Sequence, residues 1–219
     1  MKIYTGRCSG ERLQKVLELG MGIMVSSSPV ATPQKEVKQT YCALDNGAYS
    51  CYRKGYPFMK EVFLKQIADC YKKNIFLDFI VTPDIIAGGK TSFDFSLKWA
   101  LNELATAPRL ALVVHSGLKR SDICYLHRFT HIFIGDAENR TMETMKDWVS
   151  YARDNGKLVH IGHSGKYEDL MLAHELGVDS VDSTSWVVNN SFHIVERYYD
   201  SINYKPERQQ LTLFPDYAA

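Results

Sequence analysis

Five times along this chain a short, β-prone apolar run ends on an acid, an amide or a histidine. The runs span residues 43–47, 79–84, 112–117, 133–136 and 178–182. In a β/α barrel the residues just past the strand ends point into one mouth, so polar groups there converge on a single site. Three of the terminal groups are the carboxylates Asp45, Asp84 and Asp182. A core disfavours carboxylates at strand ends, whereas a site that makes or breaks a glycosidic bond requires them.

The alternation of apolar runs with helical periodicity predicts an α/β fold of the (β/α)8 TIM-barrel type, with an open doubly wound sheet as the alternative. Eight strands are expected, at residues 2–5, 22–26, 41–45, 75–81, 109–115, 131–134, 157–161 and 179–182. Helical spacing of apolar residues predicts helices near 58–73, 93–105, 141–155 and 166–176. The polar segment 27–39, with two prolines, stands where a further helix would be expected. Residues 1–200 should form one catalytic domain, and 201–219 a polar tail.

Composition narrows the class of protein. The chain has 219 residues, 45% of them hydrophobic, and a formal charge of +1. This charge excludes a strong general attraction for nucleic acid, so polyanion binding requires a local patch. The five cysteines are scattered without a CxxC pair, which argues against a disulfide framework and a structural zinc. Residues 1–5 read as a strand rather than a signal peptide, and no apolar run approaches a membrane span. We therefore expect a reduced, cytoplasmic protein.

Several blocks share their order and spacing with one enzyme family. Residues 45–49 (DNGAY) are followed by 78–84 (DFIVTPD), 96–100 (SLKWA), 114–117 (VHSG), 134–136 (IGD), 161–166 (IGHSGK) and 177–183 (GVDSVDS). Together these blocks resemble the tRNA-guanine transglycosylase superfamily, including its DNA-acting branch of 7-deazaguanine transglycosylases. The family has Asp-Ser-Gly-Gly-Tyr/Phe at the first block, Val-Gln-Gly-Gly at the fourth and Val-Gly-Glu at the fifth. The resemblance runs from about residue 41 to 188.

The resemblance implies roles for the three acids. Asp182 would be the nucleophile that attacks C1′ and holds a covalent glycosyl intermediate, Asp45 the general acid/base, and Asp84 the reader of the Watson–Crick edge of a purine. The chemistry is consistent, because a carboxylate can stabilise and trap an oxocarbenium-like centre while a second carboxyl exchanges the proton of the base. The same blocks imply a base pocket without cofactor or metal. Its expected members are Asn46, His115, Gly135, Asp136 and His163.

The chain departs from the family pattern at the pocket and at the zinc site. The usual Cys-x-Cys-x-x-Cys…His site is missing, so the zinc subdomain is absent or replaced. His115 stands where the family has a base-contacting Gln, and the paired glycines expected near Thr130 and His131 are missing. Both changes leave the identity of the bound base open. Phosphate contacts are expected from Arg53, Lys54, Lys90 and Lys166.

The C-terminal tail contains a second recognisable pattern. Residues 210–214 (QLTLF) resemble the bacterial sliding-clamp binding peptide, whose pocket-filling positions correspond to Gln210, Leu211, Leu213 and Phe214. A clamp tether would place the enzyme on newly replicated DNA. The expected partners are therefore guanine-containing DNA, a free 7-deazaguanine base, a sliding clamp and a second copy of the chain, with no membrane. A compact, zinc-free member with such a peptide suits a bacterium or a phage-infected bacterial host.

Other interpretations remain open at this point. The same site could serve an N-glycosidase that lets water resolve the intermediate, or a transglycosylase acting on a free nucleoside. The chain could also be a non-catalytic partner subunit that binds nucleic acid. His160 and His163 admit a metal-dependent hydrolase, although no acid cluster is evident beside them. In structural terms, Asp182 could cap a helix, Asp45 could form an Asx-turn and Asp84 could simply end a strand.

Overall fold

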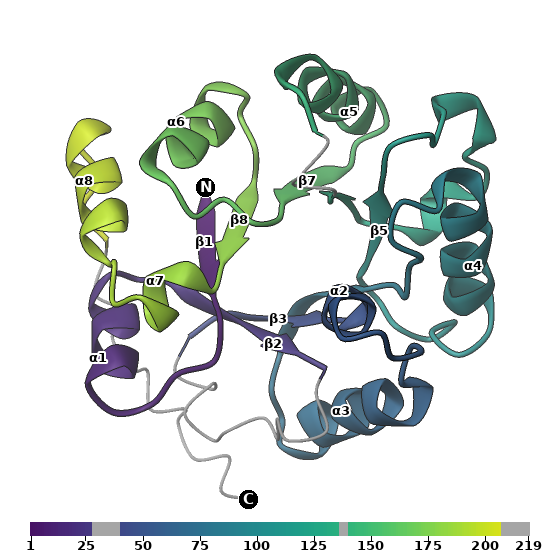
Figure 1. Ribbon diagram of the computed structural model, residues 1–219, viewed down its shortest axis with the longest axis horizontal. Coiled ribbons are helices and arrows are strands. Elements are labelled where there is room, and N and C mark those ends of the chain that lie inside the picture. The colour runs from purple at the N-terminus through teal and green to yellow at the C-terminus, as the bar shows by residue number, and fades with distance from the viewer. Residues whose placement is uncertain (28–39, 136–139, 207–219) are drawn as a thin grey trace, which may run out of the picture.

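The computed structural model describes residues 1–27, 40–135 and 140–206. Eight parallel strands form a closed barrel in the order β1-β2-β3-β4-β5-β6-β7-β8, so the chain has the (β/α)8 TIM-type fold that the sequence predicts. Figure 1 shows the helices arranged in a ring around the strands. The strands are β1 (Lys2–Thr5), β2 (Gly22–Ser26), β3 (Cys42–Asp45), β4 (Leu77–Val81), β5 (Leu110–Val114), β6 (His131–Ile134), β7 (Leu158–Ile161) and β8 (Ser180–Ser183).

Helices follow most of the strands. They are α1 (Gly10–Glu18), α2 (Ala48–Arg53), α3 (Lys60–Lys72), α4 (Gly89–Leu101), α5 (Met142–Asp154), α6 (Tyr167–Glu175), α7 (Ser185–Val188) and α8 (His193–Ser201). The connection from β5 to β6 contains two single-turn 3-10 helices, Arg120–Asp122 and Leu126–Arg128, in place of the longer helix of a regular β/α unit. This connection buries Leu118 and Phe129 in the main apolar core.

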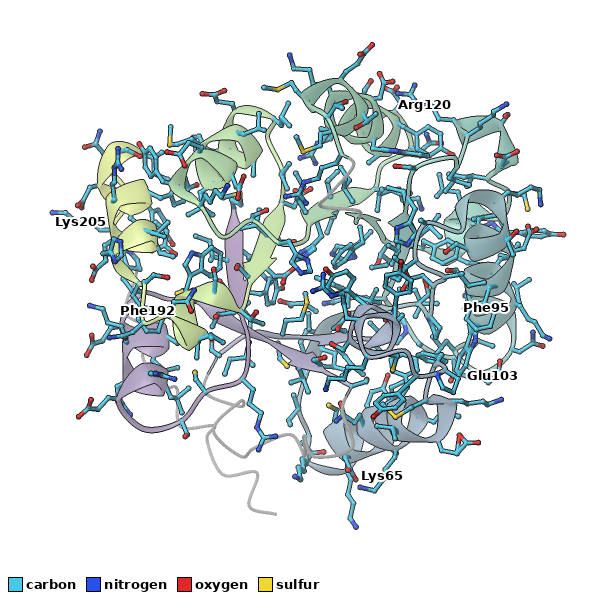
Figure 2. The ribbon with its side chains drawn as sticks, in the orientation of Figure 1. Lys65, Phe95, Glu103, Arg120, Phe192 and Lys205 are labelled. Carbon is cyan, nitrogen blue, oxygen red and sulfur yellow. The ribbon has the colours of Figure 1, made fainter. Side chains whose placement is uncertain are left out.

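The strands separate two apolar layers, because successive side chains of a strand point to opposite faces. On β5, Leu110, Leu112 and Val114 pack outward against the helices, whereas Ala111 and Val113 belong to the separate cluster inside the barrel. Tyr4 and Phe79 complete much of that inner cluster. Figure 2 shows side chains filling the space enclosed by the strands, so the barrel is a packed core and only its mouth is free for chemistry.

Most of the expected elements lie where the sequence places them. Strands β1, β2 and β6 have the predicted bounds, and the other strands differ by one or two residues at their ends. The largest shift is in α4, which begins at Gly89 rather than near residue 93. Gly89 has a φ of 50° and its backbone lies against Gly117, so the helix starts at a close approach that the periodicity of apolar residues does not reveal. Within the described ranges, no helix is long and apolar enough to cross a membrane.

Candidate active site

The three predicted acids all lie at the carboxyl ends of their strands. Asp45 is the last residue of β3, Asp84 follows β4 by three residues, and Asp182 is the third residue of β8. The structure brings them together closely enough that the charges of Asp182 and Asp84 both raise the pKa of Asp45. The sequence repeat therefore locates a real cluster of acids in the barrel mouth.

Asp45 is held in a poorly solvated position. Its Oδ2 accepts hydrogen bonds from Ser26 Oγ and from the backbone N–H of Gly47, each at 3.2 Å. Loss of solvation and, after it, the charges of Asp182 and Asp84 raise the pKa of Asp45 to about 7, and the two hydrogen bonds only partly oppose this shift. A carboxyl group with a pKa near neutrality can both give and take a proton.

Asp182 has a different environment, since a histidine lies beneath it. The Nε2 of His160 is 3.0 Å from Asp182 Oδ1, and the Nδ1 of the same ring is 2.8 Å from Ser180 Oγ. The side chain of Asp182 is 16% exposed and that of His160 is fully buried. The carboxylate therefore has a fixed hydrogen-bond partner on the barrel side and access to the mouth on the other.

Asp84 forms a buried unit with two further predicted residues. Its Oδ1 accepts a hydrogen bond of 2.7 Å from Asn46 Nδ2, and its Oδ2 lies 2.6 Å from His115 Nε2. Asn46 also donates to the carbonyl of Thr82 and accepts from the N–H of Ala48, so its amide joins the ends of β3 and β4. Among the residues that the structure describes, none pairs with His115 Nδ1, which is buried.

Two glycines leave room around these groups. A Cβ on Gly135 would lie 3.3 Å from Cε1 and 3.5 Å from Nδ1 of His115. A Cβ on Gly162 would lie 2.8 Å from the ring of Phe133 and 3.4 Å from Asp182 Oδ1. The predicted residue Gly135 therefore borders His115, and Gly162 provides equivalent space beside Asp182, a role that was not expected from the sequence.

The rim of the mouth carries a ring pair and an arginine. His163, which is exposed and has a φ of 56°, lies with its ring centroid 5.0 Å from that of Tyr49 in an edge-to-face arrangement. Arg140 donates hydrogen bonds to the carbonyls of Gly162 and His163. Loss of solvation lowers the pKa of Arg140, and the nearby charges of Asp169 and Asp182 partly oppose this effect. No motif in the sequence indicates Arg140.

The predicted phosphate contacts lie on the outside of the molecule. Arg53 and Lys54 are exposed at the end of α2, and Lys166 is exposed before α6. Lys90 is also exposed, but it forms an ion pair of 2.7 Å with Asp94 on the same helix. All four residues are therefore accessible to solvent. The labelled Lys65 and Glu103 in Figure 2 also lie at the outside of the molecule.

Some predicted residues lie outside the described part of the chain. These are Asp136 and the tail positions Gln210, Leu211, Leu213 and Phe214. In the described part, no group of three or more histidine, cysteine or acidic side chains is arranged to hold a metal ion. His160 and His163 diverge, because one fills the barrel interior and the other lies on the rim. The metal interpretation therefore has no support from their geometry.

The alternation of β7 could have indicated His160. Val159 and Ile161 pack outward into the main core, so His160 and Gly162 share the inner face of the strand. The alternation cannot reveal the hydrogen-bond partner of His160, because that partner, Asp182, lies on β8.

No protein-family model matches this chain, and no curated protein is significantly similar to it.

Proposed function

We propose that this protein is a base-exchange transglycosylase that replaces guanine in DNA with a 7-deazaguanine base through a covalent aspartyl-glycosyl intermediate. The observation that carries the proposal is the contrast between two neighbouring carboxyl groups. Asp45 has a pKa of about 7 because it is poorly solvated, whereas Asp182 Oδ1 lies 3.0 Å from Nε2 of a buried histidine. Two acids in opposed environments are the arrangement that glycosidic chemistry uses for a proton donor and a nucleophile.

In the first half-reaction, a carboxylate oxygen of Asp182 forms a bond to C1′ as the bond from C1′ to the guanine nitrogen breaks. The bonding electrons leave with the base, and the protonated carboxyl of Asp45 supplies its proton. Asp45 is suited to this step because its pKa of about 7 leaves much of it protonated at neutral pH.

The second half-reaction reverses these roles. The Asp45 carboxylate removes a proton from the ring nitrogen of the incoming base, and that nitrogen attacks C1′. The ester bond to Asp182 breaks and its electrons return to the carboxylate. One C–N bond is formed for each C–N bond broken, and no atom changes its oxidation state. The exchange therefore needs neither a redox cofactor nor a nucleoside triphosphate.

Recognition of the base is assigned to the unit of Asp84, His115 and Asn46. Asp84 Oδ1 accepts a hydrogen bond from Asn46, and Oδ2 is paired with His115 Nε2. A carboxylate has about four acceptor sites, so about two remain free. Asp84 can therefore still accept hydrogen bonds from the ring N–H and the exocyclic amine of a guanine-type edge. An adenine-type edge, which presents an acceptor at the ring position, would be disfavoured.

A base in a duplex cannot reach a barrel mouth without leaving the stack. The substrate nucleotide must be flipped or single-stranded before Asp182 can contact C1′. The exposed Arg53, Lys54 and Lys166 are the proposed contacts for the phosphates that flank it.

The tail peptide at 210–214 is proposed to bind a bacterial sliding clamp. The support for this proposal is its sequence pattern. Titration of a peptide covering 205–219 against purified clamp, with Leu213→Ala and Phe214→Ala as the matched control, tests it directly. The wild-type peptide should bind and the doubly substituted one should not; equal binding by both would exclude the motif.

The enzymatic proposal is tested by offering a labelled 7-deazaguanine base together with DNA or tRNA. Wild-type protein should incorporate label into DNA, and Asp182→Asn and Asp45→Asn should each reduce incorporation by at least about 1,000-fold. Asp69→Asn, an acid-to-amide change in α3 on the outside of the barrel, is the matched control and should retain full activity.

The products distinguish the competing interpretations. Label in tRNA instead of DNA would change the substrate but keep the chemistry. Abasic sites without incorporation would make the protein an N-glycosidase. No reaction on either polymer or on free nucleosides would contradict the proposal and favour a binding subunit.

A further inference from the structure

The histidine beneath Asp182 has an unusual position for a polar side chain. His160 is fully buried inside the barrel, with its ring centroid 4.5 Å from that of Phe133 and 5.2 Å from that of Phe79. Burying an imidazole among aromatic rings is costly unless its nitrogens are hydrogen-bonded. A leucine or methionine would fill the same space without that cost. The presence of an imidazole there suggests a use for its nitrogen atoms.

The partners of the ring fix which nitrogen carries the proton. An ionised carboxylate can only accept hydrogen bonds, so the 3.0 Å contact with Asp182 Oδ1 requires a proton on His160 Nε2. On the other side, the buried Ser180 hydroxyl lies 2.8 Å from Nδ1 and can donate to it when the ring is neutral. Ser180, His160 and Asp182 thus form a chain of hydrogen bonds directed toward the mouth.

We propose that His160 is a positioning residue for Asp182, an inference that rests on the proposed function. Its Nε2–H holds Oδ1 on the barrel side, which turns Oδ2 toward the mouth as the oxygen that attacks C1′. Within the described residues, no protein group donates a hydrogen bond to Oδ2. The missing side chain of Gly162 leaves the space next to Oδ1 open, so the carboxylate can keep this orientation.

The same hydrogen bond serves both halves of the exchange. When Oδ2 is esterified to C1′, Oδ1 becomes the carbonyl oxygen of the ester and still accepts from His160 Nε2–H. As the ester breaks, negative charge returns to the carboxylate, and the N–H stabilises it as a leaving group. His160 transfers no proton in either step. Its contribution is a fixed donor at a fully buried position.

The main competing explanation is that His160 only fills the barrel. A matched pair of substitutions separates the two. Glutamine at this position can place an amide N–H close to the position of Nε2, whereas methionine has similar length and volume but no donor. Both variants are first compared with wild type by thermal unfolding. A filling role predicts that methionine is tolerated at least as well as glutamine.

The kinetic test measures single-turnover formation and breakdown of the glycosyl-enzyme on DNA. His160→Met should slow both steps by about 100-fold with little change in KM, as expected for loss of a donor that orients a reacting group. His160→Gln should recover most of this loss. Equal rates for the two variants, or a loss confined to KM, would overturn the proposal.

A second measurement does not depend on activity. In protein with 15N-labelled histidine, NMR should find His160 protonated at Nε2 in the absence of substrate. Asp182→Asn should shift the Nε2 signal and Ser180→Ala the Nδ1 signal. A proton on Nδ1 alone, or signals that ignore both substitutions, would overturn the proposal. Absence of base exchange by wild-type protein would instead contradict the proposed function, and the NMR result would still decide whether His160 holds Asp182.

Discussion

Asp45 and Asp182 show how two identical side chains acquire different properties a short distance apart. Asp45 loses solvation and faces two other negative charges, so its pKa rises to about 7. Asp182 Oδ1 lies 3.0 Å from Nε2 of His160, which is on the strand next to its own. The difference comes from neighbours on other strands, because the residue type is the same. Two predictions follow from the raised pKa of Asp45.

The first concerns stability. A folded pKa of about 7, against 3.8 for a fully solvated aspartate, means that the folded state binds the Asp45 proton more tightly than the unfolded state. The cost of ionising Asp45 in the fold is therefore absent below about pH 4, grows as the pH rises to about 7, and is complete above that. Asp45→Asn removes this cost, which for a shift of about 3 pKa units is about 4 kcal/mol, and should stabilise the protein by up to that amount at pH 8.

Denaturant unfolding at several pH values checks this. Near pH 4 the variant and wild type should have similar free energies of unfolding, and the gap should widen toward pH 8. A gap that stays constant with pH would show that the stability change has another origin.

The second concerns activity. In the proposed mechanism Asp45 must be protonated for guanine to leave, so the rate of glycosyl-enzyme formation should be high below about pH 7 and fall above it. A pH profile of single-turnover rates on DNA measures this fall in rate, which forms the alkaline limb of the profile. The limb should vanish in the residual activity of Asp45→Asn. A profile in which formation accelerates through neutral pH would assign the proton donor to another group.

At the scale of elements, the turn from β3 into α2 positions much of the site. Asp45 ends β3, Asn46 joins that turn to the end of β4, and Gly47 carries the chain into α2 with a φ of 79°. A Cβ at Gly47 would lie 2.5 Å from the carbonyl oxygen of Ser27, so the position excludes a side chain by both space and backbone conformation. The chain can make this close turn only with glycine at position 47. The turn places the backbone N–H of Gly47 within hydrogen-bonding distance of the Asp45 carboxylate.

Gly47→Ala should thus destabilise the protein by about 3 kcal/mol and displace Asp45. Gly55→Ala is the matched control, because Gly55 has a φ of 69° with open space around it. It carries only the cost of the left-handed conformation, about 1 kcal/mol. Thermal unfolding gives both values, and base exchange should fall sharply in the Gly47 variant alone. Equal effects of the two substitutions would contradict the packing argument.

At the scale of the whole molecule, the barrel divides its polar groups between two ends. At the amino end of the strands, Asp78 accepts hydrogen bonds from Lys2 at 2.7 Å and from the hydroxyl of Tyr4 at 2.5 Å. This cluster links β1 to β4 and contacts none of the three acids at the mouth. In barrel enzymes the amino end serves stability and the carboxyl end serves chemistry.

Asp78→Ala should lower stability by about 2 kcal/mol, because it leaves the Tyr4 hydroxyl without its acceptor. Well below the unfolding temperature, kcat and KM for base exchange should stay within about twofold of wild type. The comparison is with Asp45→Asn, for which the opposite pattern is expected, higher stability and lost activity. A large loss of kcat in Asp78→Ala would show that the two ends of the barrel are coupled.

The sequence by itself determined the number and order of the strands and the position of the acids at their carboxyl ends. Both can be read from short segments, because each strand has its own apolar run and its own polar residue at the end. A closed parallel barrel is an arrangement that buries eight such strands. It did not reveal the two 3-10 helices of the β5–β6 connection, which are single turns with no buried residues and so have no apolar repeat to mark them.

Tertiary structure alone decided how the acids differ. Whether Asp45 is poorly solvated, and whether His160 lies beneath Asp182, depends on residues distant in sequence that the closed barrel places together. The pairing of Asp84 with His115 has the same origin, since the two residues come from the ends of different strands. Solvation and hydrogen bonding depend on the atoms that surround a side chain in three dimensions. Those atoms come together only when the strands close into the barrel.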